Sequence, residues 1–270
     1  MSPYGIAVLI VSIILVSASV QDVRRREVDD PHWMAICAVA FLLPIWMPDP
    51  GSGALMSSGV VLLSLYMFSE RVVGKVSLIA VSAGALCMVC AYLRSSDPGP
   101  LVAACMSLAV VAMYSVGMIR GGADAKALLS LSMAFPMYAG MGCLAWEPVY
   151  PAALVFNPVF SAMALSMPMS LLAAIPISAR NTKGGRCGLT SYRMGIEDAR
   201  SSYVWPLEDA VGGRVVHVGI AEDTGPVYDR LEELGCRDVR VTPMIPYVLP
   251  LTASFILVAV LGSPLMALAS

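Results

Sequence analysis

The first hydrophobic segment, Tyr4–Val20 (YGIAVLIVSIILVSASV), contains no charged residue, and the strongly polar segment Gln21–Asp30 (QDVRRREVDD) follows it directly. An apolar helix of about 17 to 25 residues is long enough to cross the hydrocarbon core of a bilayer. The sequence therefore places Asp22 where the first predicted span leaves the membrane. Charged residues at such positions are costly, so they tend to be paired or functional.

The same apolar pattern recurs along the chain. Of its 270 residues, 58% are hydrophobic and 13% are charged, and the mean hydropathy is +0.76, which excludes an ordinary soluble domain. We predict an all-α polytopic membrane protein with about eight transmembrane helices, near Tyr4–Val20, His32–Met47, Ala54–Phe68, Val76–Tyr92, Pro100–Ile119, Ala125–Trp146, Pro151–Ile177 and Ile245–Leu268. The seventh contains Pro158, Pro168 and Pro176, so we expect a kinked or displaced helix there.

The distribution of charge orients these spans. With eight spans, the loops near 21–31, 69–75, 120–126 and 178–244 share one side, and they hold 16 of the 17 Lys and Arg residues. Positively charged loops stay in the cytosol. The sequence therefore predicts a multi-pass protein of the cell membrane, with both termini outside and both aspartate motifs described below at the cytosolic face.

The loop at 178–244 is too long and too polar for a simple connection. Its first part, Asn181–Asp198, is rich in glycine and polar residues and is predicted to be mobile. Arg214–Ile220 and Arg237–Val241 have strand character, and Val227–Leu234 is typical of a short helix closed by a glycine. We therefore predict a membrane core at 1–177, a small cytosolic α+β insertion at 178–244 and a final transmembrane helix at 245–270.

Asp22 begins the first polar motif. Arg25 and Arg26 follow at helical spacing, so one interpretation is a helix end stabilised by ion pairs worth about 0.3–0.5 kcal/mol each. Asp30, followed by Pro31, is explained as a helix N-cap. The alternative for Asp22 is acid–base chemistry together with a second carboxyl group.

Asp124 ends the second motif, Gly121–Asp124 (GGAD), directly ahead of a predicted span. Asp124 could be a helix N-cap. Gly121 and Gly122, however, permit backbone conformations closed to other residues, and such a turn would let an extended substrate approach the backbone. The shared side of Asp22 and Asp124 favours a functional pair. The cysteine spacing does not indicate metal chemistry, and we expect no cofactor, no metal and no nucleic-acid partner.

These motifs resemble a known family. Asp22–Asp30 (DVRRREVDD) resembles the first active-site motif of type IV prepilin peptidases and is most similar to the archaeal branch, the preflagellin (prearchaellin) peptidases. Gly121–Leu128 (GGADAKAL) resembles their second motif, usually written Gly-x-Gly-Asp. Val241–Pro246 (VTPMIP), before the last span, also resembles archaeal members. Ala123 stands where the family has its second glycine, which should stiffen the turn.

The resemblance implies a membrane aspartic endopeptidase with Asp22 and Asp124 as catalytic residues and Gly121 and Gly122 at the substrate. Its partners besides the bilayer would be precursors of archaellins or type IV pilin-like proteins, which carry a short basic leader, a Gly-ended cleavage site and a hydrophobic helix. Bacterial relatives also methylate the new N-terminus and carry a cytosolic cysteine cluster between their early spans. The loop after Asp22 is short and holds no cysteine, so we expect proteolysis without methyl transfer.

Two other functions stay open on the sequence. A presenilin-like intramembrane protease also uses paired aspartates, but it would normally place the first of them within a span. A transporter could use Asp22 and Asp124 as proton or cation sites, although transporters favour charges near the bilayer midplane and repeated halves. Leader cleavage that depends on the aspartates would indicate the protease, and aspartate-dependent flux would indicate the transporter.

Overall fold

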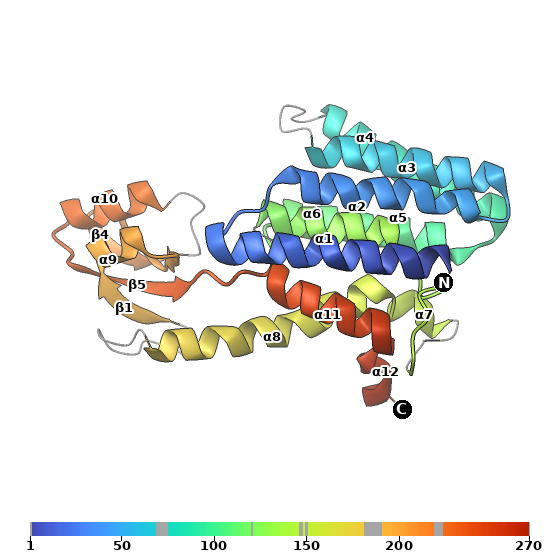
Figure 1. Ribbon diagram of the computed structural model, residues 1–270. Coiled ribbons are helices and arrows are strands. Elements are labelled where there is room, and N and C mark those ends of the chain that lie inside the picture. The colour runs from blue at the N-terminus through green and yellow to red at the C-terminus, as the bar shows by residue number, and fades with distance from the viewer. Residues whose placement is uncertain are drawn as a thin grey trace. The chain divides into compact units, whose positions relative to one another are not determined.

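The structure is a computed structural model that describes residues 2–68, 75–119, 121–145, 148, 151–180, 191–218 and 224–269. The chain divides into two compact units (Figure 1). Unit 1 comprises Met1–Ser166 and Tyr247–Ser270, and unit 2 comprises Met167–Pro246.

Unit 1 is built from helices. They are α1 (Pro3–Arg25), α2 (Asp30–Leu42), the 3₁₀ helix η1 (Leu43–Trp46), α3 (Pro50–Phe68), α4 (Lys75–Ser95), α5 (Pro98–Ser115), α6 (Gly122–Ala134), α7 (Ala152–Val155), the first part of α8 (Pro158–Arg180), α11 (Val248–Leu261) and α12 (Pro264–Ala269). In the described part of the chain, five helices are long and apolar enough to cross a membrane: α1, α3, α4, α5 and α8. The protein is thus a helical membrane protein, and the crossing of the bilayer by all eight predicted segments stays a prediction.

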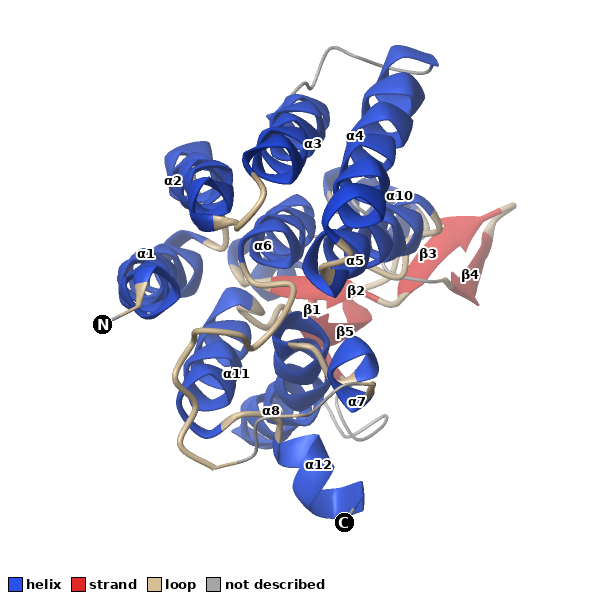
Figure 2. Ribbon diagram, turned by 90° about the vertical axis from the view of Figure 1, so that its right-hand side faces the viewer, coloured by secondary structure: helices blue, strands red, loops and turns tan. Residues whose placement is uncertain are grey.

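Helix α6 lies in the middle of unit 1, with α1, α2, α3 and α5 around it when the helices are viewed nearly end on (Figure 2). Every residue from Ala127 to Ala134 is buried. The predicted span Ala125–Trp146 is wrong in its second half, because α6 has only 13 residues and ends at Ala134. Phe135 leaves the helical conformation because Pro136 follows it, and a residue before proline is driven out of the α region.

The last predicted span is also interrupted. Helix α11 ends at Leu261, and Gly262 follows with a φ of 88°, a conformation that glycine adopts without strain. The short helix α12 begins after it at Pro264. The prolines of the seventh predicted span differ in role, because Pro158 starts α8, where a proline is tolerated, while Pro168 lies inside this helix.

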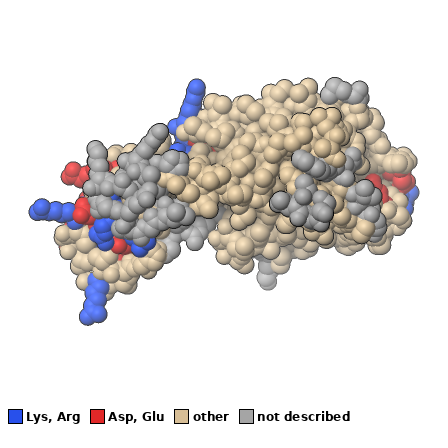
Figure 3. All heavy atoms as spheres, turned by 90° about the horizontal axis from the view of Figure 1, so that it is seen from below, with Lys and Arg blue, Asp and Glu red and all other residues tan. Residues whose placement is uncertain are grey.

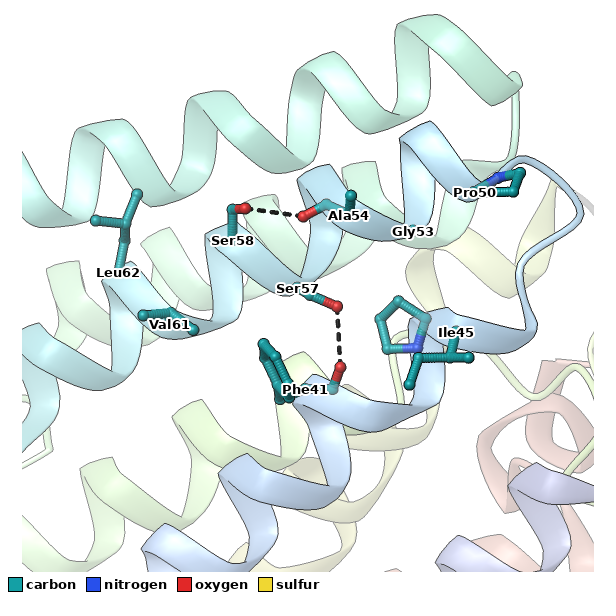
Figure 4. Close-up of a pocket in the computed structure, with 10 residues that line it drawn as sticks. Phe41, Ile45, Pro50, Gly53, Ala54, Ser57, Ser58, Val61 and Leu62 are labelled. Carbon is teal, nitrogen blue, oxygen red and sulfur yellow. Dashed lines mark hydrogen bonds between the residues drawn. The ribbon is translucent and has the colours of Figure 1, made fainter.

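Helices α3 and α4 form a closely packed pair. A Cβ added at Gly59 of α3 would lie 2.9 Å from the carbonyl oxygen of Gly84 in α4, and one added at Gly84 would lie 3.1 Å from the carbonyl oxygen of Gly59. Small residues let helix backbones approach in this way within a membrane. The neighbouring pair α2–α3 is tied by a hydrogen bond from Ser57 Oγ to the carbonyl oxygen of Phe41 at 2.9 Å (Figure 4).

Charged side chains avoid the sides of the helices in unit 1. On the face drawn in Figure 3, charged side chains lie at the two ends of unit 1, and the described surface between these ends is uncharged. At one end, Arg94 forms an ion pair with Asp49, with 2.6 Å between Nε and Oδ2. This pair involves the one cation that lies outside the predicted cytosolic loops. The uncharged surface between the two ends agrees with one that faces lipid.

Unit 2 contains a three-stranded antiparallel sheet in the order β1–β5–β2. Its strands are β1 (Tyr192–Gly195), β2 (Val204–Pro206) and β5 (Asp238–Pro243), with Tyr192 opposite Val241 and Val204 opposite Pro243. A hairpin of β3 (Glu208–Val211) and β4 (Arg214–His217) turns at Gly212 and Gly213, which have φ values of 60° and 74°. Two successive residues with positive φ are typical of a tight hairpin turn.

Two helices complete unit 2. Helices α9 (Ile196–Ser201) and α10 (Gly225–Glu233) contribute Ile196, Val227 and Leu231 to a core that they share with the sheet. The predicted helix at Val227–Leu234 and the strand at Arg237–Val241 are confirmed within one or two residues. Of the predicted mobile segment, 181–190 lies outside the described residues, while 192–198 forms β1 and the start of α9, which corrects that prediction.

Candidate active site

Asp22 lies in the last turn of α1 and is only 7% exposed. Its carboxylate oxygen Oδ2 accepts a hydrogen bond from the backbone amide of Val248 at 3.0 Å. Val248 is the first residue of α11, so Asp22 satisfies one of the free amides at the start of another helix. This contact fixes the carboxylate between the two helices.

The interface of α1 and α11 is polar at one further point. Ser19, three residues before Asp22, is buried, and its hydroxyl lies 2.7 Å from that of Thr252 in α11. Buried hydroxyl groups that bond to each other hold helices together in a membrane. The helix carrying Asp22 is therefore anchored to α11 over a full turn.

Arg26, four residues after Asp22, is the C-cap of α1. It has a φ of 58° and a ψ of 19°, and its amide donates a hydrogen bond of 2.9 Å to the carbonyl oxygen of Asp22. The loop to α2 is only four residues long, 26–29, and Gln21 closes it by bonding the side chain and the amide of Asp29. The N-cap of α2 is Asp29 rather than the predicted Asp30, which is the first helical residue.

Asp124 is the third residue of α6 and is half-buried. The interpretation of Asp124 as an N-cap is wrong, because Gly121 occupies that position. Gly121 also does not adopt a special backbone conformation: its φ of −76° and ψ of 121° are open to any residue. Its lack of a side chain matters for space, since a Cβ at Gly121 would lie 2.8 Å from Cγ of Asp124.

Gly122 differs from its neighbour. It is exposed and belongs to α6, and a Cβ there would meet nothing closer than the hydroxyl of Tyr114 at 4.0 Å. The predicted two-glycine turn is thus one N-cap residue followed by a helix. Ala123, in the position of the second family glycine, packs against the core of unit 1.

The structure brings the start of α6 to the end of α1. The carboxyl groups of Asp22 and Asp124 are close enough to interact electrostatically. Lys126, two residues after Asp124, forms an ion pair with Asp30 at the start of α2, and its ammonium group also lies 5.7 Å from the centre of the Phe68 ring. Four helix ends, of α1, α2, α6 and α11, therefore meet around the two aspartates.

Three cavities in the described part of unit 1 lie away from the aspartates. One of about 360 Å³ borders Tyr66, Tyr114, Gly122 and Lys126, on the other face of α6 from Asp124. A cavity of about 720 Å³ (Figure 4) and another of about 540 Å³ lie along α2 and α3, and Phe41 and Val61 border both of them. Neither aspartate lines any of them.

The sequence missed two contributors to this site. Val248 acts through its backbone amide, which gives no signal in a sequence. Tyr247, directly before it, could have been noticed as an aromatic hydroxyl at the start of an apolar span. The Tyr247 hydroxyl lies 2.8 Å from Ser166 Oγ, and the residue also interacts electrostatically with Asp124.

The chain is similar to the preflagellin peptidase of Methanococcus maripaludis (strain C6 / ATCC BAA-1332). The two are 20% identical over 261 residues, which cover 92% of this chain and 91% of that protein. No protein-family model and no solved structure matches the chain. The likeness extends over nearly the full length of both chains and points to a membrane-bound hydrolase of peptide bonds.

Proposed function

We propose that this protein is a membrane aspartic endopeptidase that removes a short basic leader from archaellin or type IV pilin-like precursors at the cytosolic membrane face. The observation that carries this proposal is that Asp22, in the last turn of α1, and Asp124, in the first turn of α6, are far apart in the sequence and yet lie within electrostatic reach of each other. The likeness to a preflagellin peptidase over most of the chain supports it independently.

The chemistry follows from the pair. Two carboxyl groups held close together do not easily both ionise, so one keeps a proton. The ionised group takes a proton from a water molecule, whose oxygen attacks the carbonyl carbon of the scissile peptide, while the protonated group donates its proton to the carbonyl oxygen. As the C–N bond of the tetrahedral intermediate breaks, the carboxyl group that took the proton from water gives it to the leaving nitrogen, and the other carboxylate takes a proton back from a hydroxyl of the intermediate. This releases the leader and the mature N-terminus.

Local features beside Asp22 and Asp124 bear on the proposed substrate and reaction. The 26–29 loop after α1 has only four residues and therefore holds no domain beside Asp22. The same loop offers no cysteine for a second activity, which supports proteolysis without methyl transfer. Lys126, two residues after Asp124, forms an ion pair with Asp30, which reduces its repulsion of a basic leader.

The test is cleavage of a precursor with a basic leader and a Gly-ended site by membranes that contain the protein. Wild type should release the leader, and Asp22→Asn and Asp124→Asn at equal abundance should not. A measurement of ion flux in proteoliposomes accompanies it. Flux that depends on the aspartates, without cleavage, would favour a transporter and overturn the proposal.

A further inference from the structure

Tyr247 occupies the N-cap position of α11, directly before the residue whose amide holds Asp22. Its side chain packs against the core of unit 1, and its hydroxyl lies 2.8 Å from Ser166 Oγ. The Ser166 hydroxyl also donates to the carbonyl oxygen of Met163 at 2.7 Å. A serine has one hydroxyl proton to donate, so Tyr247 is the donor in its bond with Ser166.

This bond is a second restraint on the start of α11, in addition to the bond to Asp22. The side chain of Tyr247 is held by Ser166 on α8, and the next amide along the chain is held by Asp22 on α1. Tyr247 is also within electrostatic reach of Asp124. Tyr247 therefore links α8 to the residue whose amide holds Asp22.

The chain leaves unit 1 after Ser166 and returns to it at Tyr247. The hydrogen bond between these two residues thus links the last residue of unit 1 before the chain enters unit 2 to the first residue after the chain returns. A side chain that only filled space would not need a hydroxyl group at this point. The hydroxyl instead restricts the first turn of α11, which has no side-chain hydrogen bond at its own N-cap.

We propose that Tyr247 is a positioning residue of the peptidase: bonded to Ser166, it fixes the first turn of α11 so that the Val248 amide holds the Asp22 carboxylate towards Asp124. This inference rests on the proposed function. Tyr247 does not exchange protons with the substrate in this role. It determines how often Asp22 is in the reactive position, which affects turnover more than substrate binding.

The experiment compares Tyr247→Phe, Ser166→Ala and the double variant in the full-length protein. Each single variant should lower kcat for precursor cleavage about 10-fold, the range expected for one hydrogen bond, with KM changed less than about 2-fold. The double variant should be no worse than either single one, because all three lack the same bond. Tyr92→Phe, which removes a hydroxyl from α4, is the matched control and should keep wild-type kcat.

A second readout does not depend on cleavage. Hydrogen exchange at the amide of Val248 should be faster in Tyr247→Phe and in Ser166→Ala than in wild type, and unchanged in Tyr92→Phe. Wild-type kcat in Tyr247→Phe, a loss in KM alone, or unchanged exchange at Val248 would each overturn the inference. Absence of cleavage by wild type would instead count against the proposed function, and the exchange rates would still decide the role of Tyr247.

Discussion

The carboxylate of Asp22, in the last turn of α1, accepts a hydrogen bond of 3.0 Å from the amide of Val248, the first residue of α11. Asp22 therefore has a structural role in the membrane bundle in addition to its proposed chemical role. The two roles need different properties of the side chain. The structural role needs an acceptor oxygen, and the chemical role needs a group that can gain and lose a proton.

Asp22→Ala should destabilise the protein more than Asp22→Asn. Alanine removes the acceptor oxygen, so the buried Val248 amide loses its hydrogen-bond partner. The loss of a comparable helix cap lowers the free energy of unfolding by about 1 kcal/mol. Asparagine keeps an oxygen at the same place and should stay close to wild type. Thermal unfolding in detergent measures the difference. Equal Tm values for the alanine and asparagine variants would contradict the cap.

Gly121→Ala should lower cleavage strongly, by about 10-fold or more. Its Cβ would lie 2.8 Å from Cγ of Asp124, so the carboxyl group or the start of α6 has to move. A displacement of a catalytic group by about 1 Å can cost about 100-fold in rate. Steady-state cleavage of the precursor measures the loss.

Gly122→Ala is the matched comparison for this clash. A Cβ at Gly122 approaches the hydroxyl of Tyr114 no closer than 4.0 Å, and alanine favours the helix that this residue begins. We expect a much smaller loss than in Gly121→Ala. Equal losses in both variants would show that substrate access to the glycines matters, and not the space for Asp124.

Lys126→Gln should have little effect on cleavage, less than about 5-fold. Lys126 pairs with Asp30, and the two side chains are 20% and 41% exposed, so the pair is worth about 0.2–1 kcal/mol. The exchange of both residues, Lys126→Asp with Asp30→Lys, should recover part of any stability lost in the single changes. A complete loss of cleavage in Lys126→Gln, with unchanged Tm, would mean that Lys126 contacts the substrate.

Unit 2 should lose stability in acid through one ion pair. The Arg230 guanidinium bonds both carboxylate oxygens of Asp209, at 2.9 and 2.7 Å, and holds the pKa of Asp209 below its ordinary value. A lowered pKa in the folded state stabilises the fold above the ordinary Asp value of about 4, and this contribution disappears as the pH falls through the folded-state pKa.

Asp209→Asn isolates this contribution. Hydrogen exchange in β3 and β4 of the full-length protein should show wild type better protected than the variant at pH 7. The difference should shrink as the pH falls below about 4, because protonated Asp209 no longer pairs with Arg230. The effect will be small, since Arg230 is 44% exposed. A difference that grows in acid would contradict the assigned cause.

The sequence predicted most helices because their apolar runs are long and uninterrupted, as in α1 and α5. It failed at α6, where an apolar segment continues beyond Pro136 although the helix does not. It also missed β1, since a strand of four residues beside a glycine-rich segment leaves no pattern to detect. Length and hydropathy thus locate an apolar segment without fixing its conformation.

The candidate site was predictable only in part. Asp22 and Asp124 stand out because carboxyl groups are rare beside apolar spans. The role of Gly121 was assigned to backbone freedom, whereas the structure shows that it makes room for the Asp124 side chain. The contact with Val248 could not be predicted from the sequence. Every residue except proline has a backbone amide, and only the fold decides which of them donates to Asp22.

The most direct test of the central claim is leader release from a basic-leader, Gly-ended precursor by wild type, Asp22→Asn and Asp124→Asn in membranes. The asparagine variants keep the shape of the site and, at position 22, the acceptor for Val248, so a loss reports on proton transfer. The account predicts release by wild type and none by either variant at equal abundance. Full release by either variant would contradict the two-aspartate mechanism.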